Sequence, residues 1–189
     1  FALFAECAVA GLLTLLAALP VVTLLAALAA GCAHIRAEVD GESTTLRSFD
    51  RRVRAAFRGS WRPSLGVAAS FGVLAVDVLV LRTGVPGAGA VAAACVIAAA
   101  MLAVLVLRAA ATWSSTRTWS ATLRVAARRA AVDDLGGSLL LVTALGVLVV
   151  VTWQLLPLGV PMFGCVLMAA VAVERRHARS LPDTNPREI

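Results

Sequence analysis

Residues 135–173 read LGGSLLLVTALGVLVVVTWQLLPLGVPMFGCVLMAAVAV, and no charged side chain interrupts them. As one α-helix this stretch would be about 58 Å long at ~1.5 Å per residue, whereas the hydrocarbon core of a bilayer is ~30 Å thick. The stretch therefore has to fold back, and the cluster of Pro157, Gly159 and Pro161 predicts where it turns. We expect two transmembrane helices here, at about 136–153 and 158–174.

The rest of the chain has the same apolar character. Hydrophobic residues make up 60% of the 189 residues and charged residues only 15%, well below the roughly 25% of a soluble domain. Three more spans are predicted, at about 4–33, 64–82 and 88–111. The sequence thus predicts an all-α fold: a polytopic transmembrane helix bundle of about five spans in a single domain, residues 1–180. The polar segment 181–189 is predicted to be a disordered tail.

The first apolar block is too long for a signal peptide and has no basic segment before it. Pro20 lies within it and removes one backbone donor, so we expect a single kinked span. The chain begins at Phe1 rather than at a methionine, so we also expect a preceding segment.

Two polar segments show the pattern of basic amphipathic helices. In the first, apolar side chains recur three and four residues apart, at Leu46, Phe49, Val53, Phe57 and Trp61. Its neighbouring face carries Arg47, Arg51, Arg54, Arg58 and Arg62. The second and weaker pattern combines Trp119, Leu123, Ala126 and Ala130 with Arg117, Arg124 and Arg128. We expect these arginines, together with Trp61, to bind anionic headgroups of the bilayer or a partner protein.

The arginines also predict an orientation, since the chain contains no lysine. Residues 34–62 hold seven, 82–87 one, 108–135 five, 153–161 none and 174–189 four. The positive-inside rule then gives a multi-pass protein of the plasma (inner) membrane with its N-terminus outside and its C-terminus in the cytoplasm. Topology accounts for the formal net charge of +6, so nucleic acid is not expected as a partner.

Few ionisable groups lie within the predicted spans, where such groups are commonly functional. Asp77 lies about 20 Å along the second span, and Glu6 near the outer end of the first. Together they would line an outward-facing cavity that binds a cation, a proton or a sugar hydroxyl. Alternatively, Glu6 is interfacial, and Asp77 pairs with Arg82 or forms a hydrogen bond inside the bundle. Arg108, at the cytoplasmic end of the third span, is explained by snorkelling to the surface.

The sequence offers no catalytic or metal-binding pattern. Serines and threonines are frequent at 112–120, but no histidine lies near them in sequence to act as a base. The four cysteines are far apart, which is typical of small packing residues. Cys32, His34 and His177 have no carboxylate partner at close spacing, so they do not indicate a metal site. We expect neither enzymatic activity nor a metal or cofactor.

Two stretches carry a family resemblance. Leu19-Pro20-Val21-Val22-Thr23 lies in the first apolar block, and FDRRVRAAFR at 49–58 precedes the second span. In this combination the chain resembles the YesL-like family of small bacterial membrane proteins, in which an acidic residue often stands where Glu6 does. The resemblance implies an accessory role in oligosaccharide import beside a sugar-transporter permease. The alternatives are a small transporter or channel, and a scaffold or sensor that acts through Arg47–Arg62.

Overall fold

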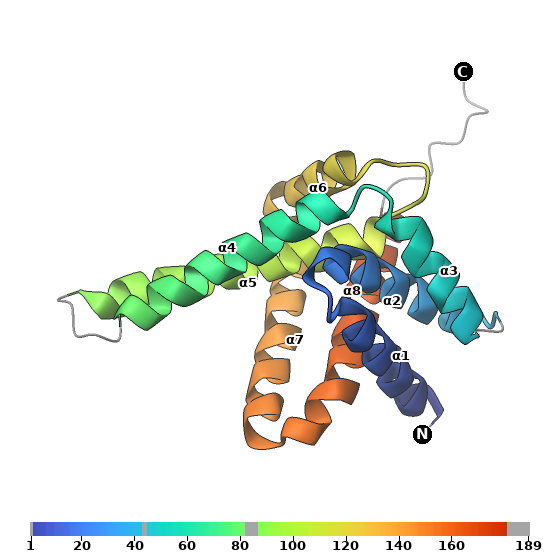
Figure 1. The fold of residues 1–189 in the computed structure, drawn as a ribbon, viewed down its shortest axis with the longest axis horizontal. Coiled ribbons are helices and arrows are strands. Elements are labelled where there is room, and N and C mark those ends of the chain that lie inside the picture. The colour runs from blue at the N-terminus through green and yellow to red at the C-terminus, as the bar shows by residue number, and fades with distance from the viewer. Residues whose placement is uncertain (1, 43–44, 82–86, 181–189) are drawn as a thin grey trace.

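The computed structural model describes residues 2–42, 45–81 and 87–180. These residues form eight α-helices and no strand, which confirms the predicted all-α fold (Figure 1). The helices are α1 (Ala2–Ala18), α2 (Leu24–Val39), α3 (Leu46–Phe57), α4 (Trp61–Leu81), α5 (Ala88–Thr112), α6 (Trp119–Arg128), α7 (Leu135–Gln154) and α8 (Gly159–Ser180). Three short helical segments join them: η1 (Val21–Thr23), the π-helical η2 (Arg129–Asp133) and η3 (Leu156–Leu158).

Five helical segments are long and apolar enough to cross a membrane: Val21–Val39, Trp61–Leu81, Ala88–Thr112, Leu135–Gln154 and Leu156–Arg179. This number agrees with the five predicted spans and is consistent with a multi-pass membrane protein. The turn expected at 153–161 is present, because α7 ends at Gln154 and η3 leads into α8. The predicted tail, 181–189, lies outside the described residues.

The prediction of a single kinked first span was wrong. Pro20 is extended, with φ −73° and ψ 116°, and it separates α1 from η1 and α2. The two helices are antiparallel, since a Cβ on Gly31 of α2 would overlap the Thr14 side chain of α1. Proline also restricts the residue before it, so α1 ends at Ala18 and the block folds into a hairpin.

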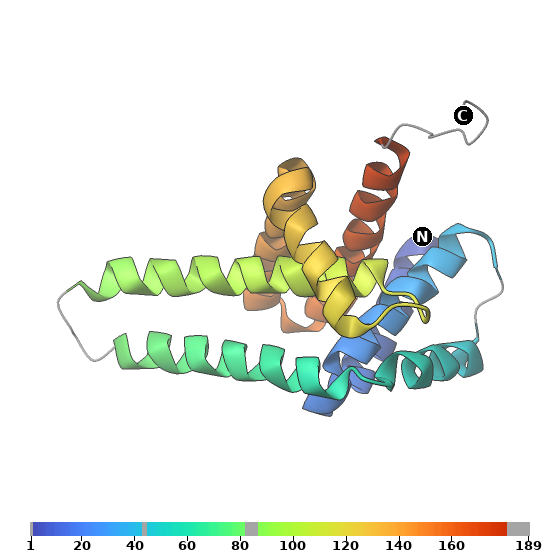
Figure 2. The same ribbon diagram turned by 90° about the horizontal axis from the view of Figure 1, so that it is seen from above.

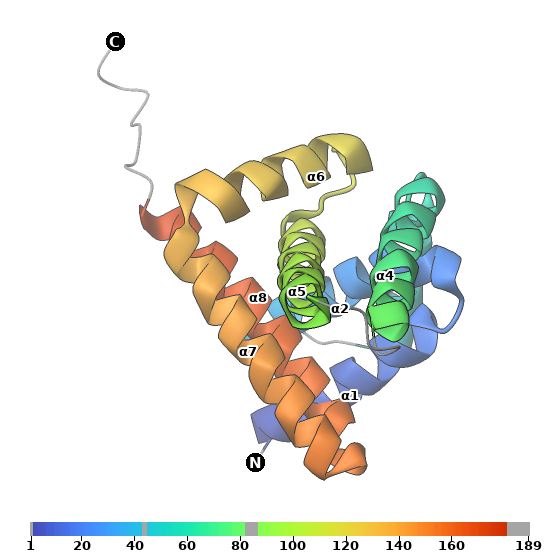
Figure 3. The ribbon, with the colours of Figure 1, turned by 90° about the vertical axis from the view of Figure 1, so that its left-hand side faces the viewer.

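The apolar helices therefore form three hairpins, α1–α2, α4–α5 and α7–α8, which point in different directions. In Figure 1 the α4–α5 hairpin extends to the left and the α7–α8 hairpin extends downward. In Figure 3 α4 and α5 are seen end-on, while α7 and α8 run across the view. The tight contact between α1 and α8 depends on glycine, because a Cβ on Gly164 would overlap the Cys7 backbone carbonyl.

The hairpins are joined where α3, α6 and the C-terminal ends of α2, α5 and α8 meet (Figure 2), and we call this region the arginine-rich face. The Trp119 indole N–H donates to the Ala56 carbonyl at 2.9 Å, which links α6 to α3. Arg36 donates to the Ala111 carbonyl, and Arg175 to the Asp40 carboxylate at 2.8 Å. The continuous buried part of α5 also lies here, at Val106–Ala111, whereas half of the residues before it are exposed, and all of these are apolar.

Candidate functional site

A cleft of about 750 Å³ opens on the arginine-rich face, between the α3–α4 junction and the segment 113–120. Three arginines line it: Arg58, Arg62 and Arg117. Four hydroxyl side chains contribute to the same lining, and they are Ser115, Thr116, Thr118 and Ser120. No carboxylate is among the lining residues, so the charge of this basic cleft is wholly positive.

Local sequence explains how the two walls form. Gly59 adopts φ +83°, a conformation that favours glycine, and this ends α3 and turns the chain into α4. Arg58 and Arg62 therefore lie on either side of one turn. On the other wall, Thr118 is extended, with φ −73° and ψ 147°, and α6 begins at the next residue.

Trp119 holds the two walls together. Its side chain is buried and its indole donates to Ala56 on α3. It also stacks on Trp113, with ring centroids 5.8 Å apart. Because a buried indole needs a hydrogen-bond partner, this bond fixes the position of segment 113–118 relative to α3.

The arginines of the basic cleft have no carboxylate within ion-pair distance in the described part of the chain. The Arg62 guanidinium instead lies over the Trp61 ring, 5.0 Å from its centroid. Elsewhere Arg54 pairs with Asp50 at 3.0 Å, and Arg175 with Asp40 at 2.8 Å. The cleft thus presents guanidinium groups that are free to bind an anion.

The predicted surface arginines separate into three groups. Arg58, Arg62 and Arg117 meet in the basic cleft, although 59 positions in sequence separate the first from the last. Arg47, Arg51 and Arg124 are exposed outside it, and Trp61 is exposed beside it. Arg54 and Arg128 are engaged by Asp50 and by Asp133, the latter at 3.7 Å.

The structure does not bring Asp77 and Glu6 together. Asp77 is exposed near the end of α4, on a hairpin that extends away from α1 (Figure 1). Glu6 is exposed near the start of α1 and lines a cleft of about 270 Å³ with His34 and Glu38. Arg82, the expected partner of Asp77, lies outside the described residues.

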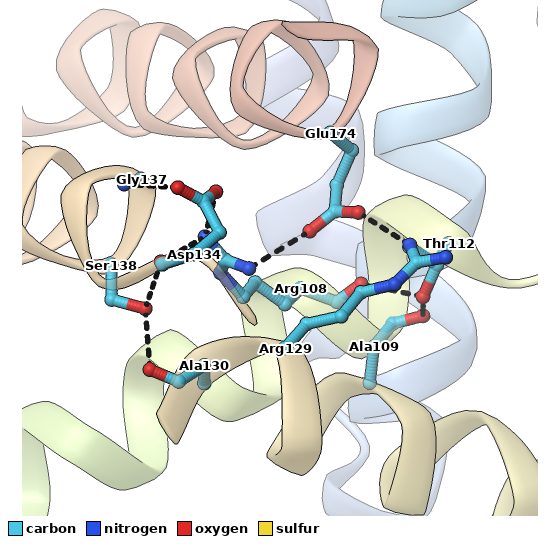
Figure 4. A network of polar contacts seen from close by, with 9 residues as sticks. All are labelled: Arg108, Ala109, Thr112, Arg129, Ala130, Asp134, Gly137, Ser138 and Glu174. Carbon is cyan, nitrogen blue, oxygen red and sulfur yellow. Dashed lines mark hydrogen bonds and ion pairs between the residues drawn. The ribbon is translucent and has the colours of Figure 1, made fainter. Parts of the chain in front are cut away.

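A cluster of four buried or half-buried charged groups also lies at this face, and the sequence did not predict it (Figure 4). Arg108 is 0% exposed, so it does not snorkel as expected. Its guanidinium lies 2.6 Å from the Asp134 carboxylate and 3.6 Å from that of Glu174. Arg129 pairs with Glu174 at 2.8 Å. This buried charge cluster connects α5, η2, α7 and α8.

Asp134 has two roles in the buried charge cluster. It is the N-cap of α7, where its carboxylate accepts a hydrogen bond from the Gly137 N–H at 2.8 Å. Burial raises the pKa of this carboxyl. The hydrogen bond from the Gly137 N–H and the Arg108 guanidinium lower the pKa by more than burial raises it, so the pKa lies below its ordinary value. The carboxylate is therefore held in its charged form.

Comparison with protein-family models, curated proteins and solved structures finds no match for this chain. The resemblance to the YesL-like family thus depends on residues 19–23 and 49–58 alone. Among the described residues, no group of three histidine, cysteine, aspartate or glutamate side chains is arranged to hold a metal ion. The feature with the clearest binding chemistry is the basic cleft.

Proposed function

We propose that this chain is a multi-pass bacterial plasma-membrane protein that assists carbohydrate uptake without itself transporting the solute. The observation that carries this proposal is the distribution of polar groups. Among the described residues, most charged side chains lie at the arginine-rich face, with Asp77 as an exception, whereas α5 up to Leu107, and all of α7, contain none. Three hydroxyls within the hairpins donate to carbonyls of their own helices: Thr14 to Ala10, Ser70 to Gly66 and Thr143 to Leu139.

This distribution favours an accessory role over a transporter or channel. A solute path needs polar groups that are free to replace water around the solute. The Thr14, Ser70 and Thr143 hydroxyls already have partners in their own helices, and Asp77 is exposed. The resemblance to the YesL-like family supports oligosaccharide import as the process, with a permease as the partner.

We infer that the arginine-rich face lies in the cytoplasm. All described arginines belong to residues 36–62, 108–129 and 175–179, which meet at this face. The expectation of an external N-terminus depended on one continuous first span. Because α1 and α2 are antiparallel, Glu6 lies beside Glu38, so we place the start of α1 on the cytoplasmic side as well and count α1, a shorter apolar helix, as a sixth crossing.

The face offers a docking surface in α3, where Arg47 and Arg51 are exposed and unpaired among the described residues. We expect deletion of the gene to reduce uptake of at least one labelled oligosaccharide. An Asp77→Asn variant should restore uptake, whereas an Arg47→Gln/Arg51→Gln variant should not. Unchanged uptake of every carbohydrate tested would contradict the proposal and favour a scaffold or sensor. Sugar flux through liposomes containing the chain alone, abolished by Asp77→Asn, would favour a transporter.

A further inference from the structure

We propose that the basic cleft binds the phosphate group of an anionic glycerophospholipid from the cytoplasmic leaflet. The inference depends on the proposed function only for placing the arginine-rich face at the cytoplasmic membrane surface. It does not depend on carbohydrate uptake or on a protein partner.

The chemistry of the lining fits a phosphate. Each of Arg58, Arg62 and Arg117 presents a planar fork of donors, which matches two phosphate oxygens at once. The hydroxyls of Ser115, Thr116 and Ser120 supply further donors around the same space. Because no carboxylate lines the cleft, no negatively charged side chain in it competes for the guanidinium groups or repels the anion.

The position of the cleft favours a lipid over a soluble phosphate compound. It lies where α4 begins and α5 has just ended, and both helices are long enough to cross a bilayer. Trp113 lines the cleft and the exposed Trp61 begins α4 beside it, and indoles are common in the headgroup region. Leu65, one turn beyond Trp61, is 43% exposed, and α4 then continues as exposed apolar surface. A headgroup in the cleft would therefore leave its acyl chains beside an apolar helix face.

Contacts within the chain hold the walls of the cleft in place. Its walls are fixed by the Trp119–Ala56 hydrogen bond and by the Gly59 turn, so the arginines are not gathered by the anion itself. Preorganised donors lose less entropy on binding, which distinguishes a defined site from the diffuse attraction of a basic helix to a charged membrane. One retained lipid per chain is therefore expected.

The test is native mass spectrometry of the full chain, released from detergent micelles that contain equal amounts of phosphatidylglycerol and phosphatidylcholine. The test variant is Arg58→Gln/Arg62→Gln/Arg117→Gln. The control is Arg47→Gln/Arg51→Gln/Arg124→Gln, which removes the same charge from exposed arginines outside the cleft. A single Arg117→Gln variant, in the exposed segment between α5 and α6, guards against a folding defect in the triple variant. Thermal unfolding of all variants is recorded in parallel.

We expect one phosphatidylglycerol to be retained by the parent chain and by the control. The affinity should fall about fivefold in the single variant and about 100-fold in the triple variant, as about 1 kcal/mol per arginine implies. Equal losses in the test and control variants would overturn the site, because they would mean diffuse attraction. Equally tight binding of glycerol 1-phosphate, measured by competition, would overturn the lipid as the ligand. If lipid binding follows this expectation but deletion of the gene leaves carbohydrate uptake unchanged, the proposed function is wrong and the lipid site stands.

Discussion

Arg108 has no exposed surface, and its charge is balanced by carboxylates that come from other parts of the chain. We expect Arg108→Gln to destabilise the protein by about 3–5 kcal/mol, because it leaves Asp134 unpaired and weakens the neutralisation of Glu174. Glu174 is only 7% exposed at its side chain, so water cannot replace the lost partner. Thermal unfolding in detergent measures the effect.

Arg128→Gln is the matched control for Arg108→Gln. The Arg128 side chain is 79% exposed and lies 3.7 Å from Asp133, so its loss should cost below about 1 kcal/mol. If both substitutions had the same small effect, the buried charge cluster would have no structural importance.

Asp134 should make stability depend on pH. The pKa of its carboxyl is lower in the folded protein than in the unfolded chain, so folding favours the charged form. The resulting stabilisation is complete above the unfolded pKa of about 3.9 and is lost as pH falls through the lower folded pKa. Asp134→Asn keeps an N-cap side chain but removes the charge.

The comparison between Asp134→Asn and the parent chain isolates this contribution from that of other carboxyls. The unfolding temperatures of the two proteins should differ most above about pH 4 and converge below it. A difference that stayed constant across this range would show that the charge of Asp134 contributes nothing.

At the scale of elements, glycine sets how closely α1 approaches α8. A Cβ on Gly164 would overlap the Cys7 carbonyl, and one on Gly11 would lie 2.5 Å from the Val160 carbonyl oxygen. We expect Gly164→Ala to destabilise the protein by about 1–3 kcal/mol, since neither backbone can move without disturbing its helix. Gly146→Ala in α7 is the control, because no atom lies within 4 Å of its added Cβ. Its effect should be neutral or stabilising by up to ~1 kcal/mol.

The α1–α2 hairpin also predicts which positions share one side of the membrane. In a variant without native cysteines, a cysteine at Ala5 should react with a membrane-impermeant maleimide from the same side as cysteines at Arg47 and Arg124. A cysteine at Trp153, 86% exposed in the α7–α8 turn region, should react from the opposite side. If Ala5→Cys reacted from the same side as Trp153→Cys, the first apolar block would cross the membrane as one continuous span, and the α1–α2 hairpin would be contradicted.

Elements governed by local pattern could be predicted from the sequence, and contacts between distant residues could not. The arginine and aromatic spacing in 46–62 is a local signal, and α3 forms over its first part, Leu46–Phe57. The predicted continuation was wrong, because the Gly59 turn ends the helix and Trp61 and Arg62 belong to α4. Pro20 is ambiguous by itself, because proline can bend a helix or end it. The decision depends on Thr14 packing against Gly31, which no local pattern encodes.

The two clusters of charge show the same limit. The basic cleft combines the ends of both predicted amphipathic helices, but contacts between distant residues, such as the Trp119–Ala56 bond, bring Arg117 to Arg58. Arg108 finds its carboxylates 26 and 66 positions later in the chain. From sequence alone, an arginine at the end of an apolar helix can either extend to the membrane surface or be buried with a carboxylate partner. The three-dimensional contacts decide which of the two occurs.

At the scale of the whole molecule, the hairpins are packed together at one region and diverge from it. Met101 of α5 and Val142 of α7 line one apolar cleft of about 400 Å³. Further along the same two helices, Val91 is 50% exposed and Trp153 is 86% exposed. Apolar surface of this extent needs hydrocarbon around it, so the diverging shape implies lipid between the hairpins.

Distances between spin labels can test this divergence. Val91 lies about 15 Å from Met101 along α5, and Trp153 about 16 Å from Val142 along α7, both away from the arginine-rich face. Because α5 runs toward the arginine-rich face and α7 runs away from it, two helices packed along their full length would give about the same distance for labels at 101/142 and at 91/153. The diverging hairpins should instead give a distance for the 91/153 pair that is longer by on the order of 10 Å or more. Equal distances in nanodiscs would mean that the bilayer holds α5 and α7 side by side, and that the apolar surface between them is covered by protein rather than by lipid.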